Sequence, residues 1–425
     1  MTKPSKPYIL HLDGDAFFVG CEMALDPTLK GKIVVTGQER GIVSALSYEA
    51  KAAGVTRGMP ISQLKRMLPQ AIVKPGNYRA YASFARQMFE IVRRFTPTVE
   101  EYSIDECFAD LTGTEKANRM TVEEIAVTIQ QTILSELDIS VSVGLAPSKC
   151  LAKVASKWAK PYGMTVIYPD DYMTYLEKTP IEKLWGIGSR MGKRFKSQGI
   201  VTAAAFAGMS EEWVHNSLAK PYRMMWYELH GFSLLPVSTA TKDSYKSIGV
   251  SRTFHPNCSN VDELISYLSR NIEHACVKAR RYQLLATHVS FFLKTKDFDY
   301  VGAELTLPYP THVPGEIMGV IEPKLRKLFN RYQYYRTTGI TLTGLVSEGR
   351  EQLDVFGLHT IRTQKSQAFM AVDKIAAKYG THSVFLASGM GARAKARQDE
   401  GVNFDKKKGG REDQVDMHVP FLSIL

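Results

Sequence analysis

Three carboxylates lie inside residues 102–111, a segment whose other residues favour a β-strand packed against a core. The acids are Asp105, Glu106 and Asp110. Burying unpaired carboxylates in a strand would cost free energy. A bound cation would neutralise their charge, and hard divalent ions such as Mg²⁺ take oxygen ligands. Because neighbouring strand residues point to opposite faces, Asp105 and Glu106 can share an ion only if the strand begins or kinks there.

A second segment supplies the further carboxylate that such a site needs. The apolar run that begins at Tyr8 ends abruptly in Asp13, where a buried strand would reach the surface. Either segment alone could simply carry capping or turn-forming acids. Together they predict that Asp13, Asp105 and Glu106 meet at one edge of a sheet. Asp15 and Asp110 are expected not to be ligands, and to be structural residues or neighbours of the ligands.

These two segments resemble the catalytic core of the Y-family translesion DNA polymerases, the DNA polymerase IV and V type. The matching motifs are DGDAFF at residues 13–18 and SIDE at residues 103–106, and the likeness continues in order over roughly residues 5–350. The resemblance implies an α+β fold in which several domains form a right hand. It also implies template-directed DNA synthesis of low fidelity past lesions, as part of DNA repair.

The resemblance implies a ferredoxin-like palm, small fingers, a helix-hairpin-helix thumb and a little finger of βαββαβ order. The alternation of strands and helices predicts palm helices on one face of a mostly antiparallel sheet. We expect these boundaries: palm 1–15 and 77–169, fingers 16–76, thumb 170–235, linker 236–246, little finger 247–350 and tail 351–425.

The chain has 425 residues and a net charge of +11, which suits a polyanionic partner such as nucleic acid. No apolar run approaches the roughly 18 residues that span a bilayer, and the first residues lack a secretory apolar region. We therefore expect a cytoplasmic protein with no membrane partner. The five cysteines show no Cys-x-x-Cys spacing, so neither a disulfide framework nor a zinc site is indicated.

The resemblance also implies a nucleotide site. Phe18 matches the family's steric gate, an aromatic ring that would clash with a 2′-hydroxyl. Tyr48 and Lys51 lie three residues apart on one face of an expected helix and could donate to a triphosphate, although the family often has arginine where Lys51 stands. Arg57 is a further candidate cation. Lys160 matches an Ala-Lys-Pro-x-Gly element whose lysine reaches the terminal phosphates.

Residues 147–161 read as a helix that ends at Pro161. Lys149, Lys153 and Lys157 recur at every fourth position of this helix. We interpret these three lysines as a solvated charged face.

Two further segments predict DNA contacts. Gly186 and Gly188 flank one apolar residue in a helix-hairpin-helix-like turn, where backbone N–H groups could approach a phosphate, and Lys193 follows on the next helix. The little finger would grip phosphates through its sheet. Its candidate contacts are Arg252, Lys294, Lys296 and Arg336.

The tail begins with a segment similar to the Gln-Leu-x-Leu-Phe peptide that docks such polymerases on a sliding clamp. Its residues are Gln352, Leu353, Val355 and Phe356. Two apolar anchors beside a glutamine suit the insertion of an extended peptide into an apolar groove. We expect a short helix at 368–379, a strand at 384–387 and a basic, disordered segment at 392–416.

The mechanism that the family implies is nucleotidyl transfer with two Mg²⁺ ions, held by Asp13, Asp105, Glu106 and the carbonyl of Gly14. The expected partners are primer-template DNA, deoxynucleoside triphosphates and a sliding clamp, and we expect a monomer. Two other classes fit parts of the pattern. A nucleotide cyclase could use the same palm without a DNA-binding thumb, and a non-catalytic DNA-binding scaffold could carry the acids for structural reasons.

Overall fold

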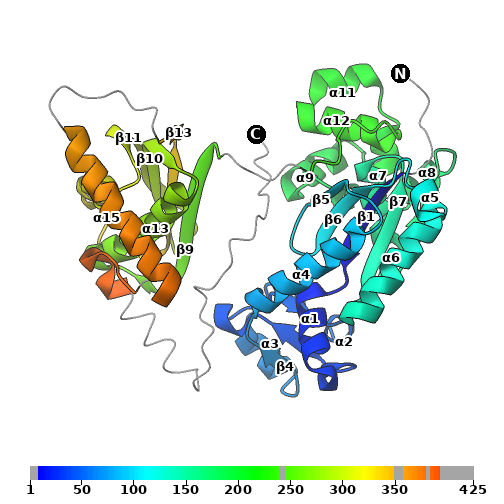
Figure 1. Ribbon diagram of the computed structural model, residues 1–425, viewed down its shortest axis with the longest axis horizontal. Helices are drawn as coiled ribbons and strands as arrows, with labels where there is room; N and C mark the ends of the chain where they lie inside the picture. Colours follow the sequence, from blue (N-terminus) through cyan, green and yellow to red (C-terminus); the bar gives the residue numbers. More distant parts are fainter. Residues whose placement is uncertain (1–7, 240–244, 349–357, 380–382, 393–425) are drawn as a thin grey trace. The chain divides into compact units, whose positions relative to one another are not determined.

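A computed structural model describes residues 8–239, 245–348, 358–379 and 383–392. The chain separates into two compact units at residues 240 and 241, inside the range expected for a linker. The first unit holds the segments expected for palm, fingers and thumb, and the second holds the little finger and the start of the tail (Figure 1). Each unit is described by itself below.

The central sheet of the first unit is five-stranded and mostly antiparallel, with the order β5-β6-β1-β7-β8. Its middle strand β1 pairs antiparallel with β6 on one side and with β7 on the other, while β7 and β8 are parallel. The strands are β1 (Ile9–Gly14), β5 (Val99–Glu101), β6 (Glu106–Asp110), β7 (Val141–Ala146) and β8 (Met164–Val166).

Helices cover both faces of this sheet, so the expectation of helices on one face is wrong. Leu10 and Leu12 of β1 pack in a core with α4 (Tyr78–Arg93) and α6 (Val122–Leu137). Ile9 points to the opposite face and packs in a core with α7 (Lys149–Trp158). The short helix α5 (Glu115–Asn118) precedes α6.

Helix α7 approaches the sheet closely because residue 144 of β7 is a glycine. A Cβ atom on Gly144 would lie 2.2 Å from the carbonyl oxygen of Ala152 and 2.2 Å from the amide nitrogen of Ser156. The absent side chain therefore sets the distance between this helix and the strands that carry the acidic residues.

The fingers segment builds a small three-stranded sheet of order β3-β2-β4 with its own apolar core. Strands β2 and β4 are parallel, with Val34 paired to Ile72, although the 35 residues between the two strands include two helices. The elements are α1 (Phe17–Leu25), η1 (Pro27–Leu29), β2 (Val34–Thr36), η2 (Gln38–Arg40), β3 (Ala45–Leu46), α2 (Tyr48–Ala52), α3 (Ile61–Met67) and β4 (Ile72–Lys74).

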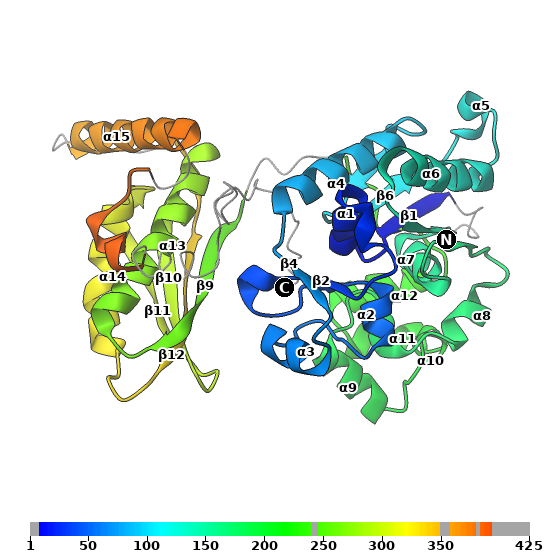
Figure 2. The ribbon, with the colours of Figure 1, turned by 90° about the horizontal axis from the view of Figure 1, so that it is seen from below.

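The thumb segment is wholly helical, and its apolar side chains join the core that α7 forms with the palm sheet. Figure 2 shows α12 beside α7, with α11, α10 and α9 following below it in this view. The helices are α8 (Tyr172–Glu177), η3 (Ile181–Lys183), α9 (Ser189–Ser197), α10 (Ala203–Ala207), α11 (Glu211–Ser217) and α12 (Lys220–Leu229).

The second unit has the predicted βαββαβ order, with a four-stranded sheet of order β11-β10-β12-β9. Helices α13 and α14 share an apolar core with one face of the sheet. The elements are β9 (Ser247–Cys258), α13 (Val261–Arg281), β10 (Leu284–Thr295), β11 (Tyr300–Thr311), α14 (Pro314–Leu328), β12 (Tyr335–Thr343) and the short β13 (Val346–Ser347).

The start of the tail packs on the helices of this unit. Helix α15 (Leu358–Tyr379) is longer than the helix predicted at 368–379, and Asp373 accepts two hydrogen bonds from the buried guanidinium of Arg280. The strand predicted at 384–387 is wrong, because a 3-10 turn, η4 (Ala387–Gly389), ends this region. Of the segment expected to be disordered at 392–416, only Ala392 is described, and it is buried; the rest lies outside the described residues.

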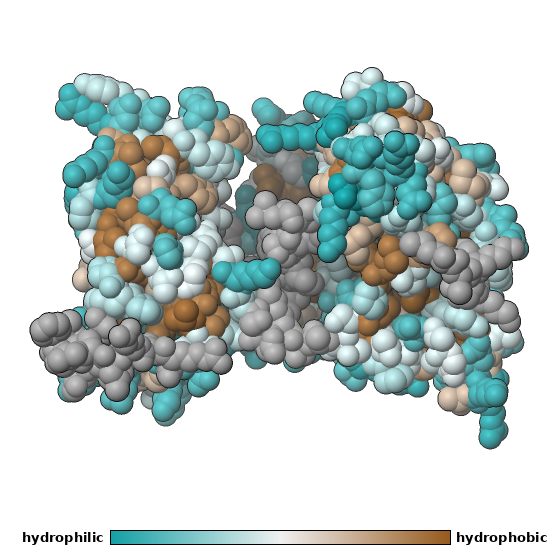
Figure 3. Space-filling view, turned by 90° about the horizontal axis from the view of Figure 1, so that it is seen from above, coloured by the Kyte–Doolittle hydropathy of each residue, from teal (hydrophilic) through white to brown (hydrophobic). Residues whose placement is uncertain are grey.

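No helix in the described part of the chain is long and apolar enough to cross a membrane. Figure 3 shows hydrophilic residues (teal) on the visible face of each unit, interspersed with hydrophobic areas (brown). All five cysteines are buried as free thiols.

Candidate active site

The acidic residues of the two motifs meet where β1 ends and β6 begins. Asp13 lies directly opposite Glu106 in the antiparallel register, and the amide of Gly14 donates to the carbonyl oxygen of Asp105 at 2.8 Å. Strand β6 begins at Glu106, as the sharing of one ion by Asp105 and Glu106 would require. Asp13 and Glu106 therefore project to the same face, towards α7.

Asp13 is a buried carboxylate with one cation beside it. The Nζ of Lys160 lies 2.5 Å from its Oδ1. The pKa of Asp13 is raised from its ordinary value of 3.8 to about 6. Burial is the largest cause, Lys160 opposes it, and the nearby Glu106 adds to the rise. Part of this raised pKa therefore reflects repulsion between two carboxylates, which a nearby positive charge would relieve.

Asp105 is held differently. Its Oδ1 accepts a hydrogen bond from the hydroxyl of Ser103 at 2.5 Å, and burial is the largest cause of the raised pKa of its carboxyl group. Arg57 lies on an exposed turn, and its charge lowers the pKa of Asp105 slightly. The exposed guanidinium is thus close enough to Asp105 for its charge to be felt there.

A divalent cation at this site would need oxygen donors that lie close together. Among the described residues, no group of three or more His, Cys, Asp or Glu side chains lies close enough together to hold a metal ion. The facing pair Asp13 and Glu106 nevertheless has the chemistry that a hard cation prefers, and lysine ammonium groups already lie 2.5 and 2.7 Å from these two carboxylates. The pair fits a divalent ion, and Asp105 is adjacent to it.

Asp15 has a structural role, as predicted. Its carboxylate accepts hydrogen bonds from the hydroxyls of Ser140 at 2.7 Å and Ser142 at 2.8 Å and from the amide of Tyr162 at 2.8 Å. These bonds tie the start of α1 to β7 and to the segment that follows α7. The three donors are distant in sequence, so sequence analysis did not find them.

Phe18 lies on α1 beside a column of aromatic rings. Its ring stacks on Tyr81 of α4, with centroids 4.7 Å apart and planes 15° apart, and meets Tyr78 edge-on at 5.7 Å. The Tyr81 hydroxyl donates to the buried carboxylate of Glu22 at 2.6 Å. This column fixes the orientation of the Phe18 ring.

Tyr48 and Lys51 both lie on α2. The Tyr48 hydroxyl is 3.5 Å from Oδ1 of Asp15, and Lys51 is exposed with its Nζ 5.9 Å from the Tyr48 ring. Ser47 caps the helix by accepting a hydrogen bond from Ala50. Both side chains thus belong to one short helix next to the Asp13–Asp15 segment.

The interpretation of α7 as a solvated lysine face is wrong for two of its three residues. Lys149 and Lys153 are buried and bind Glu100 at 2.5 Å and Glu106 at 2.7 Å, respectively. Lys157 is exposed, as expected. The lysines do recur along one helix, but Lys149 and Lys153 face carboxylates of the sheet instead of solvent.

Family models match this chain over three segments. The impB/mucB/samB family model matches residues 12–157, the IMS family HHH motif matches 169–200, and the impB/mucB/samB family C-terminal domain matches 245–355. DNA polymerase IV of Desulfatibacillum aliphaticivorans is 31% identical over 88% of this chain and 95% of its own length. DNA polymerase IV 1 of Bacillus subtilis (strain 168) is also 31% identical, over 94% of this chain and 96% of its own length.

Solved structures agree with these sequence matches. A Y-family DNA polymerase chimera of Dbh and Dpo4 superimposes with a TM-score of 0.69 at 26% identity, covering 80% of this chain and 99% of that chain. The insertion ternary complex of Dbh DNA polymerase gives a TM-score of 0.51 with the same identity and coverage.

The chain belongs to the Y family of DNA polymerases. It is a DNA-directed DNA polymerase of the translesion class with the α+β polymerase fold, as predicted. The alternatives of a nucleotide cyclase and a non-catalytic scaffold are therefore set aside. The chemistry of the family requires a divalent metal ion.

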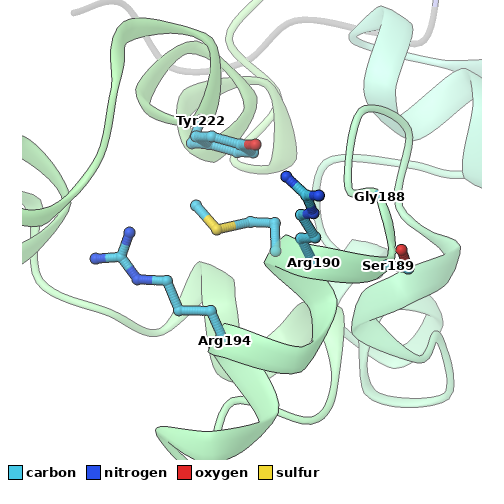
Figure 4. Close-up of a pocket in the computed structure, with 6 residues that line it drawn as sticks. Gly188, Ser189, Arg190, Arg194 and Tyr222 are labelled. Atoms are coloured by element: carbon cyan, nitrogen blue, oxygen red, sulfur yellow. The ribbon is translucent and has the colours of Figure 1, made fainter. Parts of the chain in front are cut away.

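The thumb of the polymerase has an open pocket of about 500 Å³ at the start of α9. Gly186 has a φ of +87°, a left-handed conformation that suits glycine, and Gly188 caps α9. Figure 4 shows Arg190 and Arg194 projecting to the side on which the ring of Tyr222 lies. Lys193 is exposed but does not line this pocket, and sequence analysis missed both arginines.

The little finger of the polymerase exposes a cluster of rings and cations where β10 meets β11. The Nζ of Lys294 lies 4.7 Å from the rings of both Phe298 and Tyr300, and the guanidinium of Arg336 lies 4.4 Å from the Phe298 ring. Phe298 and Tyr300 are 59% and 64% exposed, respectively. Arg252 lies on β9, opposite Thr338 of β12 in the strand register. The predicted clamp peptide at 352–356 lies outside the described residues.

Proposed function

We propose that this polymerase extends a primer by joining deoxynucleotides at the facing carboxylates of Asp13 and Glu106, with Asp105 completing the site. The single observation that supports this most is the antiparallel pairing of Asp13 with Glu106, with Lys160 2.5 Å from Asp13. Asp13, Asp105, Glu106 and the carbonyl of Gly14 would hold two Mg²⁺ ions. When bound, these ions would make the primer 3′-hydroxyl a better nucleophile and neutralise the triphosphate.

The chain's own residues then position the incoming nucleotide. Lys160 is partly exposed beside Asp13 and would donate to the terminal phosphates, with Tyr48, Lys51 and Arg57 as further donors. Phe18, held flat against Tyr81, would lie under the sugar and exclude a 2′-hydroxyl. Because α2 and the exposed turn at Arg57 belong to the small fingers, few residues close over the new base pair.

The thumb and the little finger would hold the primer-template duplex. Gly186, Gly188 and the exposed Lys193 support phosphate binding at the start of α9, and the pocket adds Arg190 and Arg194. In the little finger, Arg336 would bind phosphate while the exposed ring beside it contacts sugars or bases. Arg252 is proposed as a further contact of the little finger.

Two partner assignments rest on sequence alone. We assign Gln352, Leu353, Val355 and Phe356 to a sliding clamp, and we assign a monomeric state to the polymerase outside that complex. A pull-down of the full chain with the clamp, and sedimentation of the chain alone, test these two assignments separately.

Primer extension tests the proposal directly. Asp105→Ala combined with Glu106→Ala should abolish extension of a primed template in Mg²⁺ with four deoxynucleotides, while duplex binding is retained. Asp110→Asn is the matched control, because Asp110 lies on the same strand and its Oδ1 accepts hydrogen bonds from Thr112. Extension by the double variant at the parent rate would overturn the assignment.

A further inference from the structure

Three aromatic rings surround the ammonium group of Lys153. Its Nζ lies 4.5 Å from the centroid of Tyr102, 5.4 Å from Trp185 and 6.0 Å from Phe108. The side chain is only 6% exposed. We call Tyr102, Phe108 and Trp185 the ring cage. A desolvated cation is attracted to the faces of aromatic rings more strongly than a hydrated one, so the cage holds the Lys153 ammonium group in place.

The same ammonium group binds the carboxylate of Glu106 at 2.7 Å. Lys153 therefore contacts one of the proposed catalytic carboxylates on one side and the ring cage on the other. Since burial removes competing water, the position of the ammonium group strongly influences the direction of the Glu106 carboxylate.

One ring of the cage comes from the thumb. Trp185 immediately precedes Gly186, the left-handed residue of the turn that leads into α9. Its indole Nε1 donates to the Tyr102 hydroxyl at 3.0 Å, and the two rings meet edge-to-face at 5.4 Å. Tyr102 in turn lies just before the Ser103–Glu106 motif. The thumb turn is therefore in contact, through Trp185, with both Lys153 and the residue that precedes the acidic motif.

We propose that Lys153 is a positioning residue that couples the thumb turn, through Trp185 and the ring cage, to the orientation of the Glu106 carboxylate. DNA that engages the start of α9 would move or immobilise Trp185, and Lys153 would thereby hold Glu106 in its working direction. This inference rests on the proposed function of Glu106. It assigns to the palm–thumb contact a role in the chemical step as well as in DNA affinity.

Lys149 offers a matched comparison on the same helix. Its side chain is 4% exposed and binds Glu100 at 2.5 Å, so its burial and its ion pair resemble those of Lys153. Its ammonium group lies 5.0 Å from Phe108 and binds the carbonyl of Pro236. Lys149 thus shares with Lys153 a buried ammonium group and an ion pair, but it does not bind Glu106.

A double-mutant cycle tests the coupling. Lys153→Met and Trp185→Leu should each lower the single-turnover rate at saturating DNA and nucleotide roughly tenfold, and the double variant should lose little more, because both changes break one pathway. Lys153→Arg should recover part of the rate, since its cation can still stack on rings and pair with a carboxylate. Lys149→Met should change the rate less than threefold while costing similar thermal stability.

A binding readout without catalysis completes the test. In the absence of divalent ions, primer-template DNA should change the tryptophan emission of the parent, Trp185→Phe should remove most of that change, and Lys153→Met should alter it. Rate losses that multiply in the double variant, or an equal loss in Lys149→Met, would overturn the coupling. If the double variant at Asp105 and Glu106 stays active, the proposed function fails instead, so the two failures are distinguishable.

Discussion

Replacing Asp13 by asparagine should stabilise the free polymerase while abolishing its activity. The rise of the Asp13 pKa from 3.8 to about 6 means that the folded protein disfavours the charged carboxylate. At about 1.4 kcal/mol per pKa unit, the upper limit of this cost is about 3 kcal/mol. Because Asp13 titrates together with its neighbours, we expect a gain in the free energy of unfolding on the order of 1–2 kcal/mol.

The stability difference between Asp13→Asn and the parent should depend on pH. Between about pH 4 and 6 the folded protein keeps the Asp13 proton that the unfolded chain has released, so the contribution of Asp13 to stability falls as pH rises through this window. The advantage of Asp13→Asn should therefore be absent below about pH 4 and complete above about pH 7. Thermal melting of both proteins in a chelator measures it, with an expected rise of about 2–8 °C at pH 8.

Asp15→Asn is the control, two residues along the chain. Asp15 accepts hydrogen bonds from Ser140, Ser142 and the amide of Tyr162, so an amide NH₂ there would face donors. Asp15→Asn should therefore lower the free energy of unfolding by about 1–3 kcal/mol. A melting temperature of Asp13→Asn that is unchanged or lowered at pH 8, or a gain that does not depend on pH, would refute the reasoning.

Four further outcomes are expected. Phe18→Ala should raise the ratio of kcat/KM for ribonucleotides to that for deoxynucleotides roughly tenfold or more, and an unchanged ratio would remove the gate assignment. Arg190→Ala should weaken duplex binding and reduce the slope of log K against log[salt] by about one; a parent-like slope would argue against a phosphate contact. Phe298→Ala should weaken single-strand binding by about 1–3 kcal/mol at an unchanged salt slope, whereas Arg336→Ala should lower that slope; a parent-like affinity of Phe298→Ala would exclude stacking. Phe356→Ala should abolish the gain in processivity given by the clamp while leaving distributive extension intact, and a retained gain would exclude the peptide.

The facing carboxylates were predictable because each stands at the end of an apolar strand, and the sequence shows both strand ends. An apolar run that ends in Asp13 and a strand that starts at Glu106 need only pair antiparallel to bring the two carboxylates together, and β1 and β6 do so. The βαββαβ order of the little finger was equally accessible, since long elements of strong periodicity dominate that unit.

The partners of α7 were not predictable from the sequence. A lysine at every fourth residue looks the same whether the helix face meets water or meets carboxylates from another part of the chain. Glu100 and Glu106 lie 49 and 47 residues away from Lys149 and Lys153, so only the fold reveals that these lysines are buried. The first half of α15 was missed for a similar reason, because Lys365 and Ser366 bind Glu316 and His312, which lie 49 and 54 residues away.

The glycine at position 144 restricts how this polymerase can diverge. Even a methyl group there would collide with the backbone of α7 at Ala152 and Ser156, so the helix would have to lift away from the sheet. Lys153 would then be carried off its carboxylate although it does not touch residue 144. Substitutions of side chains can thus change the chemistry of the site. The distance between α7 and the sheet, however, depends on Gly144, which has no side chain.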